Sequence, residues 1–326
     1  MLDKYFPLYI IVFLSTLSLT AIIEKRIIPL LSKNAKQPIY EGGPAWHTSK
    51  SGTPTMGGLG FLFSASFVLF VSALFLISIE ERERGISLLL STSFCILNSL
   101  VGVIDDLTKL KKKENAGLTP TQKILLQLGL CALFFLARSF FLHEEGIIRC
   151  SLFGIELTAL TLPLMLLIFL GLINCANLTD GIDGLASCVA FSIGISLFYI
   201  CAARSSDGAI ISVSLIGATI GFLIFNLHPA KIFMGDTGSL FLGSLVAVSS
   251  LSLNNSLLII PISGIYVIEG ISVIAQVLFY KATKKRLLKM APLHHHLEKC
   301  GLSENTICVI AILLTLVLSL PAFIFS

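Results

Sequence analysis

The segment LTALTLPLMLLIFLGLINC at residues 157–175 is apolar almost throughout, and it runs directly into ANLTDGIDG at 176–184, which carries two aspartates and two glycines. A second apolar run, LASCVAFSIGISLFYICAA at 185–203, follows at once. A helix needs about 20 mainly apolar residues to cross the hydrocarbon core of a bilayer. The two runs therefore predict a pair of membrane-spanning helices joined by a short acidic turn at one membrane surface.

The rest of the chain repeats this alternation of long apolar runs and short polar loops. Of its 326 residues, 55% are hydrophobic and only 13% are charged, and the mean hydropathy is +0.91. Soluble domains carry about 25% charged residues, so this composition excludes a soluble fold, a disordered chain and a nucleic-acid-binding protein. We therefore predict an all-α polytopic membrane protein, a single domain over residues 1–326, with about ten transmembrane helices. The apolar runs lie near residues 7–23, 57–79, 86–104, 124–142, 157–175, 185–203, 209–227, 239–253, 256–280 and 305–325.

The distribution of basic residues predicts the orientation of these helices. If the ten spans alternate in direction, 17 of the 23 lysines and arginines fall in the loops on the side opposite the N-terminus. Cytoplasmic loops of membrane proteins carry such an excess of Lys and Arg. The basic loops are therefore predicted to be cytoplasmic. Both termini are predicted to be extracytoplasmic, since an even number of spans places them on one side.

The conspicuous polar clusters all fall in these basic loops. Transporters instead place polar residues near the bilayer midplane, on interrupted helices. We therefore expect an active site at the cytoplasmic face rather than a transport pathway. The clusters are GPAWHTSKSGTPTMGG at 43–58, Asp105-Asp106, NLTDGIDG at 177–184, Asn226 with FMGDTGS at 233–239, and His294-His295-His296.

The adjacent carboxylates of Asp105 and Asp106 directly follow the apolar run 86–104. Two such groups repel one another unless a cation or a proton intervenes. Neighbouring residues on a helix point about 100° apart, so the two side chains are expected to serve different partners. A solvated helix terminus is the alternative interpretation of this pair.

The acidic turn after the fifth span has a helical spacing. Asn177, Asp180 and Asp183 recur every three residues and would share one face of a helical turn. Gly181 and Gly184 allow the backbone to approach a ligand closely. The turn contains no Lys or Arg to pair with its carboxylates, which favours a bound cation or the donor groups of a ligand. A polar turn with a helix cap is the alternative.

Asp236 lies in a Gly-Asp-Thr-Gly-Ser turn just before the run 239–253. It could cap the following helix, and the same turn could present backbone N–H groups to an anion. Carboxylates in Gly-rich turns without cysteine ligands suit Mg²⁺, which binds through one or two carboxylates and substrate phosphates. Lysines beside the paired aspartates would add positive charge, or would contact anionic lipid headgroups. These lysines are Lys109, Lys111, Lys112, Lys113 and Lys123.

The three consecutive histidines follow a basic stretch at 281–289 and are predicted to lie in a loop, where they could donate to phosphates. Neighbouring side chains diverge on a helix, which makes the triplet a poor metal chelator. Glu269 and Gln276 fall within the run 256–280, seven residues apart and so on one face. A carboxylate inside an apolar span is a candidate functional residue.

Together these motifs resemble the phospho-N-acetylmuramoyl-pentapeptide transferase family, a branch of the polyprenyl-phosphate N-acetylhexosamine-1-phosphate transferases. The resemblance runs from Lys36 to Glu304 with matching order and spacing, although Leu297 stands where the family more commonly has Phe. The motifs shared with the whole superfamily are Asp105-Asp106, NLTDGIDGL at 177–185 and FMGDTGS at 233–239. Those resembling the muramoyl-pentapeptide branch are Lys50 with GTPTMGG at 52–58, and APLHHHLE at 291–298.

The resemblance implies a ten-helix bundle in the bacterial plasma (inner) membrane, with both termini outside. It implies transfer of phospho-MurNAc-pentapeptide from UDP-MurNAc-pentapeptide to undecaprenyl phosphate, which yields UMP and lipid I in peptidoglycan synthesis. It further implies a requirement for Mg²⁺, contacts with membrane lipid, a homodimer, and inhibition by nucleoside antibiotics such as tunicamycin.

The resemblance also implies roles for individual residues. Asp236 is expected to bind Mg²⁺, with Asp105 and Asp106 as possible further ligands, and Asp105 is the candidate base for the lipid phosphate. His294 completes the expected catalytic set. The expected substrate-binding residues are Lys50, Thr55, Lys109, Lys123, Asn177, Asp180, Gly181, Asp183, Asn226, Phe233, Gln276, His295 and His296.

Three alternatives stay open from the sequence. A two-step reaction through an aspartyl-phosphate competes with direct transfer. A UDP-HexNAc-1-phosphate transferase for another polyprenyl-linked polymer would keep the same chemistry with a different donor. A lipid or ion transporter would belong to another functional class and would release no UMP.

Overall fold

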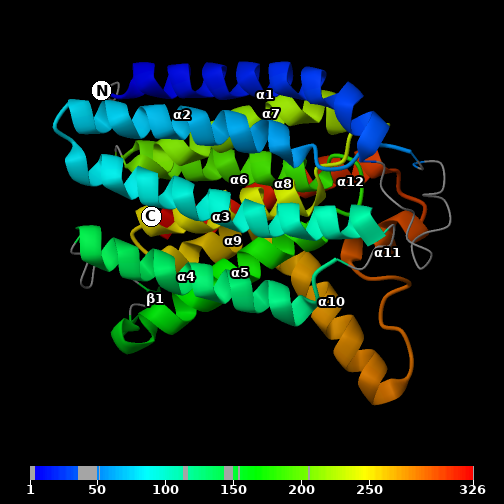
Figure 1. Cartoon of the computed structure of the whole chain (residues 1–326). Helices are drawn as coiled ribbons and strands as arrows, with labels where there is room; N and C mark the ends of the chain where they lie inside the picture. The colour runs from blue at the N-terminus through cyan, green and yellow to red at the C-terminus, as the bar shows by residue number, and fades with distance from the viewer. Residues whose placement is uncertain are drawn as a thin grey trace.

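In a computed structural model the chain forms a bundle of long helices (Figure 1). The structure describes residues 4–35, 50, 52–112, 117–142, 150–152, 155–204 and 206–325, so the predicted motif residues 43–49, Ser51 and Lys113 lie outside the described residues. A short hairpin joins β1 (Ser151–Leu152) to β2 (Ile155–Glu156). The helices are α1 (Phe6–Asn34), α2 (Gly58–Ser78), α3 (Arg82–Lys112), α4 (Pro120–Leu142), α5 (Thr161–Thr179), α6 (Leu185–Ala202), α7 (Asp207–Asn226), α8 (Gly235–Ser249), α9 (Ile259–Ile262), α10 (Gly264–Thr283), α11 (Leu293–Lys299) and α12 (Glu304–Phe325).

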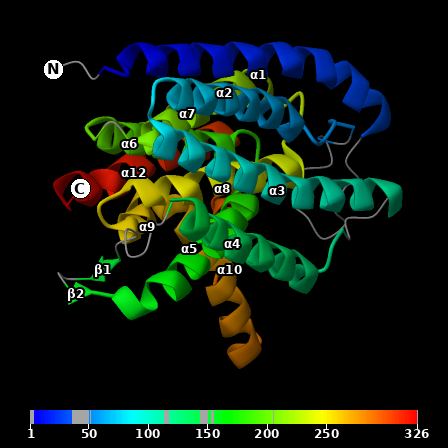
Figure 2. The ribbon, with the colours of Figure 1, turned by 60° about the vertical axis from the view of Figure 1, so that its left-hand side comes forward.

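The helices confirm the predicted all-helical membrane class. Among the described residues, nine helices are long and apolar enough to cross a membrane, namely α1 to α7, α10 and α12. The first described residues and the end of α12 lie at the same end of the bundle (Figure 1, Figure 2), and α11 lies at the other end (Figure 1). Which side of the membrane each end faces stays a prediction.

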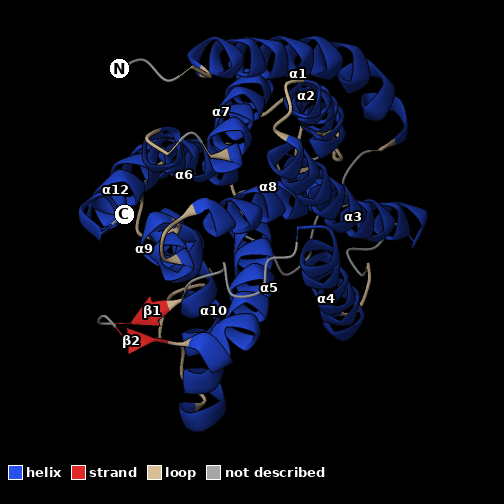
Figure 3. Ribbon diagram, turned by 90° about the vertical axis from the view of Figure 1, so that its left-hand side faces the viewer, coloured by secondary structure: helices blue, strands red, loops and turns tan. Residues whose placement is uncertain are grey.

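The predicted eighth span is α8, which has only 15 residues. At 1.5 Å rise per residue it covers about 22 Å, less than the hydrocarbon thickness of about 30 Å. Every residue from Thr237 to Ser249 is buried, because α8 is surrounded by α2, α3, α5, α6 and α7 (Figure 3). A helix enclosed by other helices does not need to match the bilayer, so α8 forms the centre of the bundle.

The prediction of one continuous ninth helix over 256–280 was wrong. The chain forms a 3₁₀ turn at Ser256–Leu258, then the short α9, and α10 begins only at Gly264. Helix α10 then projects away from the bundle (Figure 1, Figure 2). Its outer face is apolar and exposed, including Ile271, Ile274 and Leu278, as expected for a surface covered by lipid.

Two helices extend further than their apolar runs predicted. Helix α1 continues to Asn34, eleven residues beyond the expected end at residue 23, and α3 continues to Lys112. Asp105 and Asp106 therefore lie inside α3 and are buried, 1% and 3% exposed, rather than at a solvated terminus. The apolar run ends at residue 104, but the helix continues, and neighbouring segments supply hydrogen-bond partners for both aspartates.

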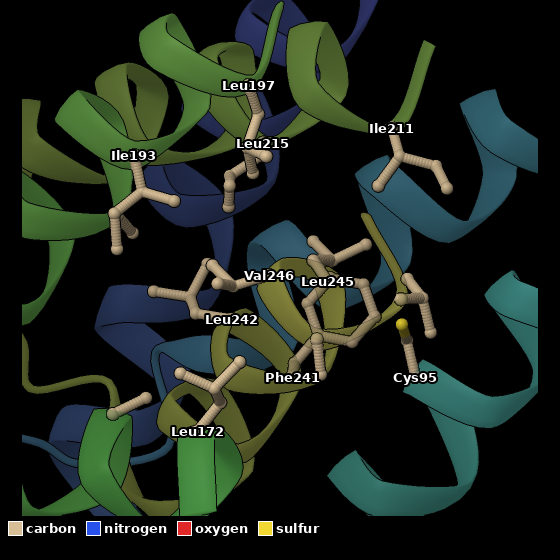
Figure 4. Close-up of a cluster of buried hydrophobic side chains, with 14 of the residues drawn as sticks. Cys95, Leu172, Ile193, Leu197, Ile211, Leu215, Phe241, Leu242, Leu245 and Val246 are labelled. Carbon is tan, nitrogen blue, oxygen red and sulfur yellow. The ribbon is translucent and has the colours of Figure 1, made fainter. Parts of the chain in front are cut away.

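The core of the bundle is a continuous apolar cluster around α8. Phe241, Leu242 and Leu245 of α8 pack against Leu172 of α5 and Leu215 of α7 (Figure 4). At the N-terminal end of α8 the packing changes from large side chains to glycine contacts. A Cβ atom at Gly58 would lie 2.2 Å from the Cα of Gly238, and one at Gly102 would lie 2.4 Å from the carbonyl oxygen of Asp236. Glycine thus allows α2 and α3 to approach the segment that carries Asp236.

Replacing Gly58 by Ala should therefore destabilise the protein. The added methyl group meets backbone atoms, so α2 and α8 must separate, at a cost of about 1–3 kcal/mol. The measurement is the thermal unfolding midpoint of purified protein in detergent. The matched control is Gly129→Ala on α4, where a Cβ meets nothing within 4 Å, and where the midpoint should stay unchanged or rise slightly. Equal midpoints for Gly58→Ala and the wild type would contradict the close-packing argument.

Candidate active site

The carboxylate of Asp106 binds the N-terminal end of α8. Its Oδ1 accepts a hydrogen bond from the backbone N–H of Asp236 at 3.1 Å. Its Oδ2 accepts from the backbone N–H of Thr237 at 2.9 Å and from the Thr237 hydroxyl at 2.7 Å. The first N–H groups of a helix lack partners within it and favour negative charge. Asp106 of α3 therefore caps α8 from a distant part of the sequence.

Gly235 makes this arrangement possible. Its φ of +69° lies in the left-handed region, which glycine adopts without the steric penalty of a Cβ. A Cβ at this position would also lie 2.6 Å from Asp106 Oδ2. The glycine before Asp236 is thus required both by the backbone conformation and by the approach of the capping carboxylate.

Asp105 and Asp236 face two lysines at the same place. The Nζ of Lys109 lies 2.6 Å from Asp105 Oδ2 and 3.2 Å from Asp236 Oδ2. The Nζ of Lys123 lies 3.3 Å from Asp105 Oδ1 and 2.5 Å from Asp236 Oδ2. Each lysine bridges the two carboxylates, so the cluster contains closely spaced charges of both signs. Lys111 and Lys112 are exposed on the same helix end, as expected for contacts with solvent or lipid headgroups.

Further contacts fix the orientation of these carboxylates. The Nδ2 of Asn177, at the end of α5, donates to Asp236 Oδ1 at 2.9 Å and to the Ser239 hydroxyl at 2.8 Å. The backbone N–H of Leu118 donates to Asp105 Oδ1 at 2.8 Å. Helices α3, α5 and α8 and the start of the α4 segment therefore converge on this carboxylate–lysine cluster, which consists of Asp105, Asp106, Asp236, Lys109 and Lys123.

A second charged cluster lies on the other side of the acidic turn. Lys50 Nζ lies 2.7 Å from Asp183 Oδ1 and 2.7 Å from Glu304 Oε2. His228 Nδ1 lies 2.9 Å from Asp183 Oδ2, and Glu304 Oε2 also accepts from the backbone N–H of Asp183 at 2.7 Å. Sequence reasoning missed His228 and Glu304. Glu304 is the first residue of α12. Acidic residues are common at helix starts because they interact favourably with the helix dipole, so its sequence position gave no sign of a further role.

An open pocket of about 860 Å³ adjoins this Lys50–Asp183 cluster. His228 and Glu304 belong to both. The lining includes both basic and acidic side chains, which suits a ligand with groups of both charges. Its other lining residues are Lys289, Glu298, Lys299, Gly301, Leu302, Ser303 and Asn305.

The side chains of Asn226 and Gln276 form hydrogen bonds with backbone groups. The Asn226 side chain is buried, accepts from the Gly184 N–H at 3.1 Å and donates to the Ile232 carbonyl at 2.8 Å. Gln276 Oε1 accepts from the N–H groups of Leu287 and Leu288 at 3.1 and 2.8 Å. Both were predicted to contact substrate. In this structure they hold loops in place.

The three histidines lie on the short helix α11 and not in a loop, and the expected divergence was wrong for the first two, because the ring centroids of His294 and His295 are 4.2 Å apart. His294 is fully buried, whereas His295 Nδ1 lies 2.6 Å from Glu298 Oε2. His296 Nδ1 accepts from the backbone N–H of Lys289 at 3.1 Å. Each ring therefore has a different environment, and only His294 approaches the acidic turn, where it contacts Gly181.

Thr55 and Phe233 lie next to the start of α8. The backbone N–H of Phe233 donates to the Pro54 carbonyl, and its carbonyl accepts from the Gly57 N–H, both at 2.8 Å. Thr55 is buried, with its hydroxyl close to Gly235, and Phe233 is half-buried. The segment after Lys50 is thus joined to the segment before Asp236 through paired backbone groups.

The turn 177–184 connects all of these parts. Asn177 contacts Asp236, Gly181 lies against His294, and Asp183 contacts Lys50. Burial raises the pKa of the Asp180 carboxyl well above its usual range, and the carboxylates of Asp236, Asp106 and Asp183 act in the same direction. A bound cation or a ligand's hydrogen-bond donors would relieve this concentration of negative charge.

Two sets of side chains have the geometry of a metal site among the described residues. They are Asp105 with Asp106 and Asp236, and Asp183 with His228 and Glu304, each with ligand atoms within 4.8 Å of one another. The first is all oxygen, which suits Mg²⁺. Because both oxygens of Asp106 accept hydrogen bonds from the start of α8, Asp105 and Asp236 are the carboxylates of this set that would face a cation. Lysine ammonium groups bridge the carboxylates of both sets, so the preference for the first set rests on its ligands being oxygen atoms alone.

The chain is similar in sequence to known proteins over most of its length. Residues 86–254 match the family model described as glycosyl transferase family 4, and residues 50–62 match signature 1 of the phospho-N-acetylmuramoyl-pentapeptide-transferases. The chain is 42% identical over 297 residues to the phospho-N-acetylmuramoyl-pentapeptide-transferase of Halalkalibacterium halodurans, covering 89% of each chain. The chain belongs to this transferase family.

Two further members show the same extent of similarity. The phospho-N-acetylmuramoyl-pentapeptide-transferase of Clostridioides difficile is 38% identical over 304 residues, which cover 91% of each chain. That of Bacillus thuringiensis is 42% identical over 286 residues, which cover 86% of each chain. The range 86–254 that matches the family model covers the paired aspartates, the acidic turn and Asp236, and the range 50–62 that matches the signature covers Lys50 and Thr55.

Replacing Asp106 by Asn should lower thermal stability. The amide NH₂ would face N–H and O–H donors at the start of α8, and leaving buried groups of this kind unpaired costs about 1–3 kcal/mol. The measurement is the unfolding midpoint in detergent, with Glu83→Gln at the exposed start of α3 as the charge-matched control that should not change it. An Asp106→Asn variant as stable as the wild type would contradict the capping role.

Proposed function

We propose that the protein transfers phospho-MurNAc-pentapeptide from UDP-MurNAc-pentapeptide to undecaprenyl phosphate, which gives lipid I and UMP in peptidoglycan synthesis. Family membership supports the reaction, and the match over residues 50–62 favours the muramoyl-pentapeptide branch over transferases for other UDP-sugars. The observation that carries the proposal is the carboxylate–lysine cluster at the buried start of α8, where two anionic substrates could meet.

The charges of this cluster suit a reaction between two phosphate-bearing substrates. Such substrates repel one another, and fixed cations at the site of charge development lower that barrier. Lys109 and Lys123 are each held between Asp105 and Asp236, so their ammonium groups are already in place when the phosphates arrive. A phosphate oxygen could then replace a carboxylate as the partner of either lysine.

Asp236 and Asp105 are the residues that would hold Mg²⁺ in this proposal. When bound, the ion supplies Lewis-acid stabilisation of the diphosphate. Asn177 fixes Asp236 through Oδ1 and leaves Oδ2 directed toward the lysines. Asp106 would support the metal site indirectly, because it accepts a hydrogen bond from the backbone N–H of Asp236 and so holds the helix turn that carries this side chain.

In the transfer step, an oxygen of undecaprenyl phosphate forms a bond to the β-phosphorus of the donor. The bond from that phosphorus to the bridging oxygen breaks, and UMP departs. Asp105 is the proposed base for any proton left on the lipid phosphate. Because the second pKa of a phosphate is near 6, much of the acceptor is already ionised at neutral pH, so Asp105 also acts by orienting charge. The two-step alternative would place the phosphosugar on an aspartate first.

Donor binding is proposed to use the acidic turn and its neighbours. The half-buried ring of Phe233 could stack on uracil, and Asp180 could accept from its N–H. Asn177, Gly181 and Asp183 belong to the same turn, Lys50 contacts Asp183, and Thr55 is the further residue proposed for donor binding. Asn226 and Gln276 act by holding loops, and His294, His295 and His296 are proposed to face phosphate or sugar.

The remaining proposals concern the cellular setting. The protein would lie in the bacterial plasma (inner) membrane as one domain with ten spans, its site cytoplasmic and both termini outside. The exposed apolar face of α10 suits contact with membrane lipid. The protein is also proposed to form a homodimer and to be inhibited by nucleoside antibiotics such as tunicamycin. A transporter is disfavoured because the polar clusters gather at one end of the bundle.

The reaction can be tested by UMP release from purified protein in detergent with undecaprenyl phosphate and Mg²⁺. UDP-MurNAc-pentapeptide should support release, UDP-GlcNAc should not, and chelation should abolish it reversibly. Asp236→Asn should lower the rate by at least about 100-fold because it removes the carboxylate beside both lysines.

The matched control is Asp207→Asn at the opposite end of the bundle, where Asp207 accepts from Ser87. It should keep wild-type activity. Release only with UDP-GlcNAc would overturn the proposed donor, and no release with either donor from folded protein would favour the transporter.

A further inference from the structure

His294 is held by an acidic residue on another helix. Glu269 of α10 is 4% exposed and His294 of α11 is fully buried. The backbone N–H of His294 donates to Glu269 Oε1 at 3.2 Å and Oε2 at 3.3 Å. The ring Nδ1 lies 3.2 Å from Glu269 Oε2. One carboxylate thus binds both the backbone and the ring of the same residue, and it ties α11 to the bundle.

This contact decides which ring nitrogen carries the proton. An ionised carboxylate only accepts hydrogen bonds, so Nδ1 must donate to Glu269. In the neutral ring, Nε2 is then left with its lone pair. Nε2 is buried and has no hydrogen-bond partner within the described residues. A buried ring nitrogen of this kind is energetically unfavourable until a ligand pairs with it.

Nε2 points at the centre of the acidic turn. A Cβ built on Gly181 would lie 2.1 Å from Nε2, so the nitrogen lies close against the glycine of this turn. The same turn carries Asn177, which contacts Asp236, and Asp183, which contacts Lys50. The unpaired nitrogen therefore faces the segment that joins the two charged clusters.

We propose that Glu269 is a positioning residue for the transfer reaction. It fixes His294 as the tautomer with a proton on Nδ1 and presents the Nε2 lone pair to a hydrogen-bond donor group of the bound UDP-sugar. The inference rests on the proposed function for the identity of the ligand. The assignment of the tautomer rests on the Glu269–His294 contacts alone.

The decisive variant is Glu269→Gln. Its amide oxygen can still accept from the His294 backbone N–H, but its NH₂ group would donate to Nδ1 and move the ring proton to Nε2. With the UMP-release assay, kcat should fall at least about 10-fold while KM for the donor changes less than about threefold. Glu269→Asp should recover part of kcat, since it restores an acceptor. Glu83→Gln, at the exposed start of α3, is the matched control and should leave both values unchanged.

A double variant separates positioning from simple support of α11. If Glu269 acts through the ring of His294, Glu269→Gln should lower kcat no further in a His294→Ala background. An equal fold-loss in both backgrounds would overturn the proposal, because the effect would then reside in the helix contact. Unfolding midpoints of all variants show which remain folded.

A readout without substrate tests the tautomer directly. Nitrogen NMR of the full-length protein with ¹⁵N-labelled histidine, with the His294 signals assigned by their loss in His294→Ala, should show a proton on Nδ1 in the wild type. Glu269→Gln should show it on Nε2. The same tautomer in both proteins would refute the proposal. Absence of UMP release from the wild type would instead refute the proposed function and leave this assignment intact.

Discussion

The contact between Asp106 and the start of α8 is the interaction on which the site depends. A buried carboxylate needs hydrogen-bond donors, and the first turn of a buried helix needs acceptors. Both requirements are met together, because the Asp106 carboxylate accepts hydrogen bonds from the backbone N–H groups of Asp236 and Thr237. The same contact places the Asp236 side chain beside Asp105 of α3. Without it, the central helix would begin with unpaired groups.

The short central helix explains why the site forms at this depth. Because α8 is enclosed by five other helices, its N-terminus need not reach the membrane surface, and its end is lined by backbone rather than lipid. Gly58, Gly102 and Gly235 allow this close approach. The carboxylate–lysine cluster is therefore built into the rigid core, which limits the reorganisation needed when charged substrates arrive.

Charge balance links the two clusters across the acidic turn. On one side Lys109 and Lys123 bridge Asp105 and Asp236, and on the other Lys50 bridges Asp183 and Glu304. The turn between them holds Asp180 and lies against Nε2 of His294, which has no hydrogen-bond partner in the part of the chain that the structure describes. In the proposed reaction, phosphates compete for these lysines and the donor's polar groups approach the turn. In this proposal the acidic turn connects the residues that would recognise the donor with the carboxylate–lysine cluster at which transfer would occur.

Apolar run length determined the membrane class and nearly all of the long helices, because a helix that crosses a bilayer needs about 20 mainly apolar residues. The motifs also identified the family and the residues that gather at one end of the bundle. The break before α10, the extension of α3 and the enclosure of α8 depended on packing between distant segments. So did the pairing of Lys50 with Glu304 and of His294 with Glu269, since residues 254 and 25 positions apart carry no local signal of contact. The sequence by itself determined which carboxylates, lysines and histidines the chain contains. The tertiary structure decided which carboxylate caps a helix, which binds a lysine and which orients a histidine. These roles depend on the hydrogen-bond donors that folding brings within reach of each carboxylate.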